Sequence, residues 1–196
     1  MSRELRQRIA VSAAQLIAES GDLSYSKARE KAAKHLGCND RRQLPENSEI
    51  EAALHEHLQL FKSPERISYL NDLRNNALSA MRSFDQFQPH LIGPILTGTA
   101  SVNTPISLIL FADTVEAVVM ELMERKIPWR QKDISVDYSK QKRVRRSLLT
   151  FFAGDIQVEL LILPLTDQHN LPLDPIQGRP QKGASISKVQ AMMEPD

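Results

Sequence analysis

The sequence contains a single cysteine, Cys38, among its 196 residues. One cysteine excludes an internal disulfide and a thiolate cluster for zinc or iron–sulfur, which fits a reducing cytosol. No window approaches the ~18 apolar residues of a membrane span, and the N-terminal MSRELRQRIA lacks the apolar core of a signal peptide. These absences predict a cytoplasmic protein without a membrane partner.

The chain also has little net charge. Its formal charge is +1, and aromatic residues make up 5% of it. A nearly neutral chain has no overall attraction for nucleic acid or acidic lipid, so any such binding must come from a local cluster. One basic cluster is present in the second half of the sequence: Lys140, Lys142, Arg143, Arg145 and Arg146.

The first half of the sequence shows apolar residues at helical spacing. The pattern predicts amphipathic helices over residues 3–20, from a Ser24 cap to Gly37, and over about 48–61. A fourth helix is predicted from Ser63-Pro64 to about Phe87, because serine followed by proline is a typical helix start. Residues 1–88 are therefore predicted to be a helical region.

The second half begins with two apolar runs, 91–96 and 106–111, on either side of Gly98-Thr99. Both runs are predicted strands, and Asp113 with Glu116 predicts a capping box for the helix that follows. Alternating residues predict a hairpin over 134–152, and the mostly apolar run 156–163 predicts an interior strand. A docked loop rich in proline and glycine and a short helix over 187–193 end the chain. The predicted class is α+β, with residues 89–196 forming a mixed sheet and flanking helices.

This order, a strand, a Gly-Thr turn, a second strand and a helix, resembles the polymerase-beta-like nucleotidyltransferase superfamily over about residues 91–163. In that family a Gly-Ser turn orients a triphosphate, and an Asp-x-Asp on the next strand binds two metal ions. The resemblance assigns the turn to Gly98 and Thr99, and the two aspartate positions to Pro105 and Ser107. Neither of those residues is a carboxylate, so the chain resembles a degenerate member of the family.

Glu159 is the candidate catalytic residue, because it is a carboxylate in an apolar strand and needs a partner there. The resemblance gives it the position of the family's third carboxylate, on a strand beside the Asp-x-Asp strand. The alternative is a structural ion pair with a nearby arginine such as Arg143 or Arg145.

The candidates for nucleotide or phosphate binding are Gly98, Thr99 and Ser107 together with two pairs of basic residues. On a strand Arg143 and Arg145 share one face, while Lys142 and Arg146 share the other. They are either a solubilising hairpin tip or a contact to the phosphates of a nucleotide or nucleic acid. Arg179 and Lys182 lie in a Pro/Gly loop that either holds a phosphate or packs over the sheet.

The function predicted first is a degenerate nucleotidyltransferase-like protein without transfer activity, which binds a nucleotide or nucleic acid in a regulatory role. One alternative is an active, magnesium-dependent transferase in which Asp133, Asp137 or Asp155 converges with Glu159. The other is an adaptor that binds a protein partner through its helical half. Magnesium is implied by the active transferase alone, and otherwise no cofactor is predicted.

Overall fold

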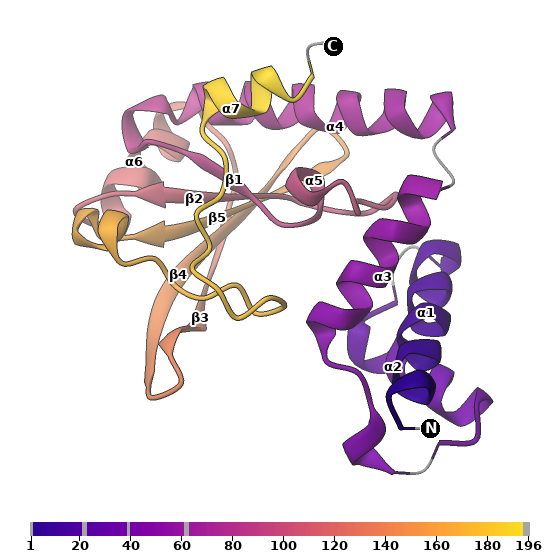
Figure 1. The fold of residues 1–196 in the computed structure, drawn as a ribbon. Helices are drawn as coiled ribbons and strands as arrows, with labels where there is room; N and C mark the ends of the chain where they lie inside the picture. The colour runs from indigo at the N-terminus through magenta and orange to yellow at the C-terminus, as the bar shows by residue number, and fades with distance from the viewer. Residues whose placement is uncertain (1, 21–22, 39, 61–62, 194–196) are drawn as a thin grey trace. The chain divides into compact units, whose positions relative to one another are not determined.

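A computed structural model describes residues 2–20, 23–38, 40–60 and 63–193 of the chain. The chain divides into two compact units (Figure 1). The helical unit comprises Met1–Ile67 and Gly98–Asn103, and the sheet unit comprises Ser68–Thr97 and Thr104–Asp196. These units differ from the predicted regions 1–88 and 89–196, because most of the fourth helix falls with the sheet and the segment 98–103 falls with the helices.

The helical unit is built on α1 (Ser2–Ser20), which packs against α2 (Tyr25–His35) and α3 (Asn47–Leu60). The buried side chains at its centre include Ile9, Ala13 and Ala28. Alanines at these positions let the helix backbones approach closely. The three predicted helices are confirmed, although the predicted end of the third at Phe61 lies outside the described residues.

Helix α4 (Pro64–Ser83) starts where the sequence predicts, since the Ser63 hydroxyl accepts a hydrogen bond from the backbone N–H of Arg66 at 3.2 Å. It ends earlier than predicted. The chain turns after Ser83 into a short 3₁₀ helix, η2 (Asp85–Phe87), and Gln88 then takes a left-handed conformation. No helix in the described part of the chain is both long and apolar enough to span a membrane.

The sheet unit contains a mixed sheet with strand order β1-β2-β5-β4-β3 (Figure 1). The central strands β2 and β5 are parallel, and the other neighbours are antiparallel. The α+β class and the predicted hairpin over 134–152 are confirmed. The strands are β1 (His90–Ile92), β2 (Ile106–Phe111), β3 (Arg130–Ser139), β4 (Lys142–Ala153) and β5 (Ile156–Leu163).

Two predictions near the first strands are wrong. The run 91–96 is a strand only as far as Ile92, because Gly93 adopts a φ of 76° and Pro94 then starts the short helix α5 (Pro94–Thr97). Helix α6 (Val115–Glu124) is capped by Thr114 rather than Asp113. The Thr114 hydroxyl accepts from the backbone N–H of Ala117 at 3.4 Å.

The two faces of the sheet are covered differently. One face packs toward α4, and the Phe84 and Phe151 rings meet there with their centroids 6.1 Å apart. The other face carries a separate apolar cluster that includes Ile109, Leu148 and Leu161. Over this second face runs the C-terminal chain, from η3 (Leu165–His169) to α7 (Ile186–Ala191) (Figure 1). As predicted, most of that chain is an ordered loop followed by a short helix.

Candidate functional site

A cavity of about 440 Å³ lies in the sheet unit between the second sheet face and the C-terminal segment, residues 172–184, of which the part from Pro172 to Gln181 lines the cavity. The strands form its floor, and the segment forms a wall. The segment is held in place because the backbone N–H of Leu173 donates to the carbonyl of Asp137 at 2.6 Å, and because Leu91 and Ala184 form an antiparallel bridge. The residues that line the cavity include Ser107, Asp137, Leu148, Glu159, Leu161, Pro172, Leu173, Asp174 and Pro175.

Ser107 and Glu159 lie side by side in this cavity. They are direct partners in the parallel register of β2 and β5, so their side chains leave the sheet on the same face. Both are half-buried. The sheet therefore brings together the two strand positions that the resemblance links, with a hydroxyl where the family has an aspartate.

Glu159 is not held by an arginine. The Gln157 side-chain amide, on the same face of β5, donates to Glu159 Oε1 at 3.1 Å. Within the described residues Glu159 forms no ion pair. Arg143 and Arg145 cannot reach it, because they follow the alternation of β4 onto the other face. The predicted alternative of a Glu159 ion pair with either arginine is therefore wrong.

The lining includes two other acidic residues, Asp137 and Asp174, and both carboxylates are bound within the protein, that of Asp137 on the opposite sheet face. Asp137 is bound by Arg143, with Nε at 2.6 Å and Nη2 at 3.0 Å from its oxygens. This bidentate pair holds the pKa of Asp137 below its usual value. Asp174 Oδ1 accepts from the backbone N–H groups of Ile176 at 2.8 Å and Gln177 at 2.7 Å.

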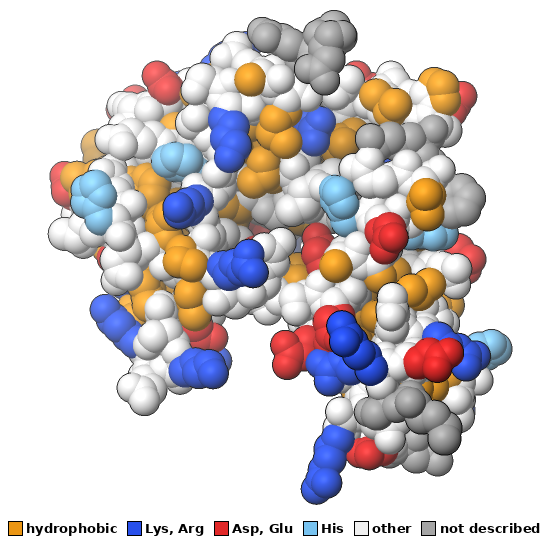
Figure 2. Space-filling model, in the orientation of Figure 1, with side chains coloured by type: hydrophobic (Ala, Val, Ile, Leu, Met, Phe, Trp, Pro, Cys, Tyr) orange, Lys and Arg blue, Asp and Glu red, His pale blue; other side chains and the backbone are white. Residues whose placement is uncertain are grey.

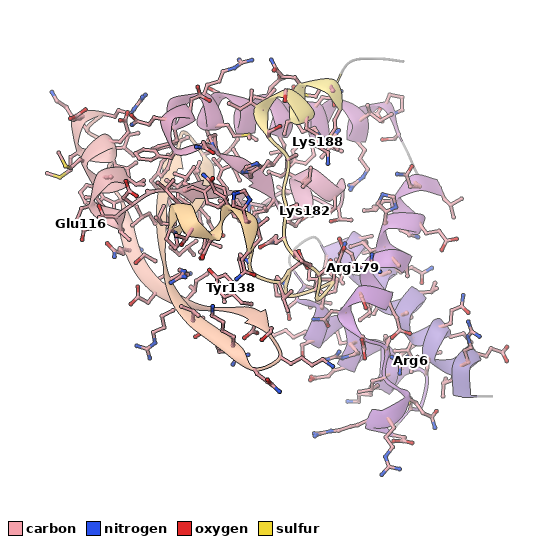
Figure 3. The ribbon with its side chains drawn as sticks, turned by 60° about the vertical axis from the view of Figure 1, so that its left-hand side comes forward. Arg6, Glu116, Tyr138, Arg179, Lys182 and Lys188 are labelled. Atoms are coloured by element: carbon pink, nitrogen blue, oxygen red, sulfur yellow. The ribbon has the colours of Figure 1, made fainter. Side chains whose placement is uncertain are left out.

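The basic residues that are predicted to bind phosphate are not gathered at the cavity, although Ser107 lines it. Arg145 is exposed on the opposite sheet face, and Arg179 and Lys182 are exposed on the C-terminal segment (Figure 3). None of them is among the residues that line the cavity. On the face drawn in Figure 2, Lys and Arg side chains are scattered singly over the sheet unit. The structure thus brings Ser107 and Glu159 together without the four predicted cations.

Gly98 and Thr99 belong to the helical unit. The Thr99 hydroxyl donates to Glu51 Oε1 at 3.4 Å, and Arg66 Nη2 donates to the carbonyls of Gly98 at 3.1 Å and Ala100 at 3.3 Å. Tyr25 also donates its hydroxyl to the Glu51 carboxylate. These contacts engage the Thr99 hydroxyl and two carbonyls of the turn within the helical unit, so they give the turn a structural role.

The sequence analysis did not identify Glu51. The sequence does contain one indication of its role. Glu51 lies three residues before the buried Leu54 on α3, so a charged residue falls at the edge of the apolar stripe. Its partner Thr99 is 48 residues away in sequence. Periodicity within one helix cannot reveal a contact of that separation.

The aspartates required by an active transferase do not converge with Glu159. The Asp133 carboxylate accepts from the Ser147 hydroxyl at 3.1 Å on the sheet face that also holds Asp137. Asp155 lies in the β4–β5 turn, four residues from Glu159, which corresponds to roughly 13 Å along a strand. Among the described residues, no three His, Cys, Asp or Glu side chains form a group that could hold a metal ion.

A second polar cluster joins the hairpin to η3. Arg146 donates from Nη2 to Asp167 Oδ2 at 2.9 Å and from Nε to the Tyr138 hydroxyl at 3.1 Å, while that hydroxyl donates to Asp167. Burial, and next the hydrogen bond to Asp167, raise the pKa of Tyr138. We call Tyr138, Arg146 and Asp167 the hairpin clamp. Arg146, which the sequence places in the basic cluster, is therefore a structural residue.

No family model and no curated protein matches this chain. Two solved structures are similar to part of it. One is a cytoplasmic RNA terminal U-transferase, 13% identical, with a TM-score of 0.29 over 51% of this chain and 35% of that one. The other is the GLD-2/RNP-8 complex, 20% identical, with a TM-score of 0.32 over 59% of this chain and 43% of that one. The chain spans less than half of either protein, and at these TM-scores neither likeness bears on function.

Proposed function

We propose that this chain is a nucleotidyltransferase-like binding protein, which takes a nucleotide or its nucleoside part into the cavity over its sheet without transferring a nucleotidyl group. The observation that carries the proposal is the pairing of Ser107 with Glu159 inside an otherwise largely apolar cavity. A hydroxyl next to one carboxylate is suited to hydrogen bonding with a ligand. One carboxylate and a hydroxyl do not supply the several carboxylates that two metal ions require.

Nucleotidyl transfer by two metals needs several carboxylates around cations about 3.5–4 Å apart, which together hold the nucleophile and the triphosphate. Among the acidic residues of the lining, Glu159 alone lies beside Ser107, where the family has an aspartate. Asp137 is bound to Arg143, and Asp174 is bound by its own loop. The remaining chemistry at this site is recognition of a ligand.

The cavity has the features of a small-molecule site. Its volume of about 440 Å³ lies within the ~300–1,000 Å³ usual for such sites, and its lining is mainly apolar with a few polar groups directed inward. Leu148 and Leu161 supply the floor, and Ser107 and Glu159 supply the polar groups. Binding there would involve the sheet unit alone.

Ligand binding is expected to raise the melting temperature of the protein, because a ligand that binds only the native state stabilises it by mass action. The panel is the four ribonucleosides with their mono- and triphosphates, each with and without magnesium. At a concentration one hundred times its Kd, a ligand adds about 2.7 kcal/mol to the free energy of unfolding.

A Ser107→Leu variant is expected to lose this shift, because leucine occupies the space beside Glu159. Thr166→Leu, at an exposed position of the same unit, serves as the matched control. If no compound shifts the wild-type protein, or if the shift survives in Ser107→Leu, the cavity is not the binding site.

The protein is also expected to show no magnesium-dependent transfer from any ribonucleoside triphosphate. Labelled triphosphates are incubated with the protein, a single-stranded RNA and magnesium, and incorporation into RNA or protein is measured against a Glu159→Ala variant. Because Pro105 and Ser107 provide no carboxylate, both proteins should give the same background. Labelling by the wild type above that of the variant would show that catalysis survives.

A further inference from the structure

We propose that the cavity binds an unphosphorylated, planar heterocycle with two adjacent N–H donors, whose donor edge pairs with the Glu159 carboxylate. This inference rests on the proposed function and narrows its ligand. A guanine-type ring has such an edge, and so does a 2-amino-substituted benzimidazole.

The charge of the lining opposes a phosphate. Two carboxylates line the cavity, Glu159 and Asp174, and the described residues that line it include no Lys, Arg or His. Asp137 meets the segment through its backbone carbonyl, while its carboxylate lies on the opposite sheet face and is neutralised there by Arg143. Since unlike charges attract more strongly where water is partly excluded, this lining favours a neutral donor or a cation over an anion. A ligand with a free triphosphate would place its negative charge beside Glu159.

Glu159 is the carboxylate with capacity left for a ligand. Asp174 already accepts two backbone N–H groups, and its other oxygen accepts from the Gln181 amide at 3.3 Å. Glu159 accepts only the Gln157 amide, on Oε1, among the hydrogen bonds of the described residues. An ionised carboxylate offers about four lone-pair positions on two oxygens, so Oε2 and part of Oε1 remain. Two parallel N–H groups match that arrangement, as in bidentate pairs with carboxylates.

The walls suit a flat apolar ring. Leu148 and Leu161 lie on the strand side, and Pro172, Leu173 and Pro175 lie on the segment side. These side chains contribute apolar surface and lack side-chain groups that would need to bond with a ligand. A ring between them would bury its faces against carbon while its donor edge reaches Glu159.

The test compares four compounds by isothermal titration calorimetry on the whole chain: guanosine, inosine, GTP and 2-aminobenzimidazole. Inosine keeps the ring N–H but lacks the 2-amino group. We expect guanosine or 2-aminobenzimidazole to bind, with guanosine at least about tenfold tighter than inosine, because a missing donor leaves a carboxylate oxygen unpaired. GTP should bind more weakly than guanosine.

Glu159→Gln should abolish the preference for guanosine over inosine, since an amide presents one acceptor and one donor where the carboxylate presents two acceptors. Its melting temperature should equal or exceed that of the wild type, because the substitution removes a half-buried charge and strands no cation. Glu116→Gln, on the exposed side of α6 in the same unit (Figure 3), is the matched control and should bind like the wild type.

The outcomes separate this inference from the proposed function. GTP binding as tightly as guanosine, or a guanosine preference that persists in Glu159→Gln, overturns the donor-edge inference while leaving a ligand site. Binding of uridine in the thermal panel with neither guanosine nor 2-aminobenzimidazole bound overturns it as well. If none of these compounds and none of the thermal panel binds, the proposed function itself fails.

Discussion

An Asp167→Ala variant is expected to lose about 3 kcal/mol of unfolding free energy, the lower end of the range for breaking one partner of a buried ion pair. Arg146 and Asp167 are mostly buried, with side chains 23% and 13% exposed. Removal of the carboxylate leaves the Arg146 guanidinium without its anion and the Tyr138 hydroxyl without its acceptor. Both groups would then remain partly desolvated without compensation.

Urea denaturation measures the effect. With a typical slope for a protein of this size, a loss of this magnitude moves the midpoint by about 1–2 M. Asp137→Ala is the matched control, because it breaks an arginine–aspartate pair on the same hairpin whose side chains are 70% and 44% exposed. Exposed ion pairs contribute little to the free energy of unfolding. Equal midpoints for the two variants would show that the hairpin clamp is not a stabilising contact.

The stability that the hairpin clamp contributes also depends on pH. The folded protein raises the pKa of Tyr138, so its protonated hydroxyl contributes stability below the usual tyrosine pKa of about 10. That contribution is lost as the pH rises through the higher pKa of the folded state. Tyr138→Phe should lose this part of the pH dependence and keep the Arg146–Asp167 pair.

The fold was largely predictable because its elements depend on local pattern. The 3.6-residue spacing of apolar residues places α1 to α4, alternation places β3 and β4, and a mostly apolar run places β5. The errors occur where one residue overrides a continuous apolar run, as Gly93 and Pro94 do after Ile92. An apolar run does not by itself distinguish a strand from a short buried helix.

The site was predictable only in part. The resemblance implies that Glu159 lies on a strand beside the one that carries Ser107, and the parallel register places the two residues as direct partners. The partners of charged side chains were not predictable, since Asp167 meets Arg146 across 21 residues and Glu51 meets Thr99 across 48. Strand alternation predicts that Arg143 and Arg146 lie on opposite faces, but it does not reveal that each of them pairs with its own aspartate.

Gly183→Ala is expected to displace the C-terminal segment from β1 and so to disturb the cavity wall. Gly183 has a φ of 64°, and an added Cβ would lie 2.8 Å from the carbonyl oxygen of Leu91 and 3.0 Å from His90 Cβ and Ile92 Cγ2. Backbone atoms of β1 cannot move aside without losing the Leu91–Ala184 bridge, whose two hydrogen bonds are each 2.8 Å long.

The left-handed conformation alone costs an alanine roughly 1–2 kcal/mol, and overpacking typically adds about 1–3 kcal/mol. Gly178→Ala separates the two costs, because Gly178 shares a φ of 64° in the same segment but has nothing within 4 Å of an added Cβ. Urea midpoints should therefore fall further for Gly183→Ala than for Gly178→Ala. Guanosine titration should show weaker binding for Gly183→Ala as well, since its strain falls on the attachment that holds the wall of the cavity. Equal losses of stability in Gly183→Ala and Gly178→Ala would contradict this prediction. They would mean that the C-terminal segment can shift away from β1 without strain, so that β1 does not hold the cavity wall in place.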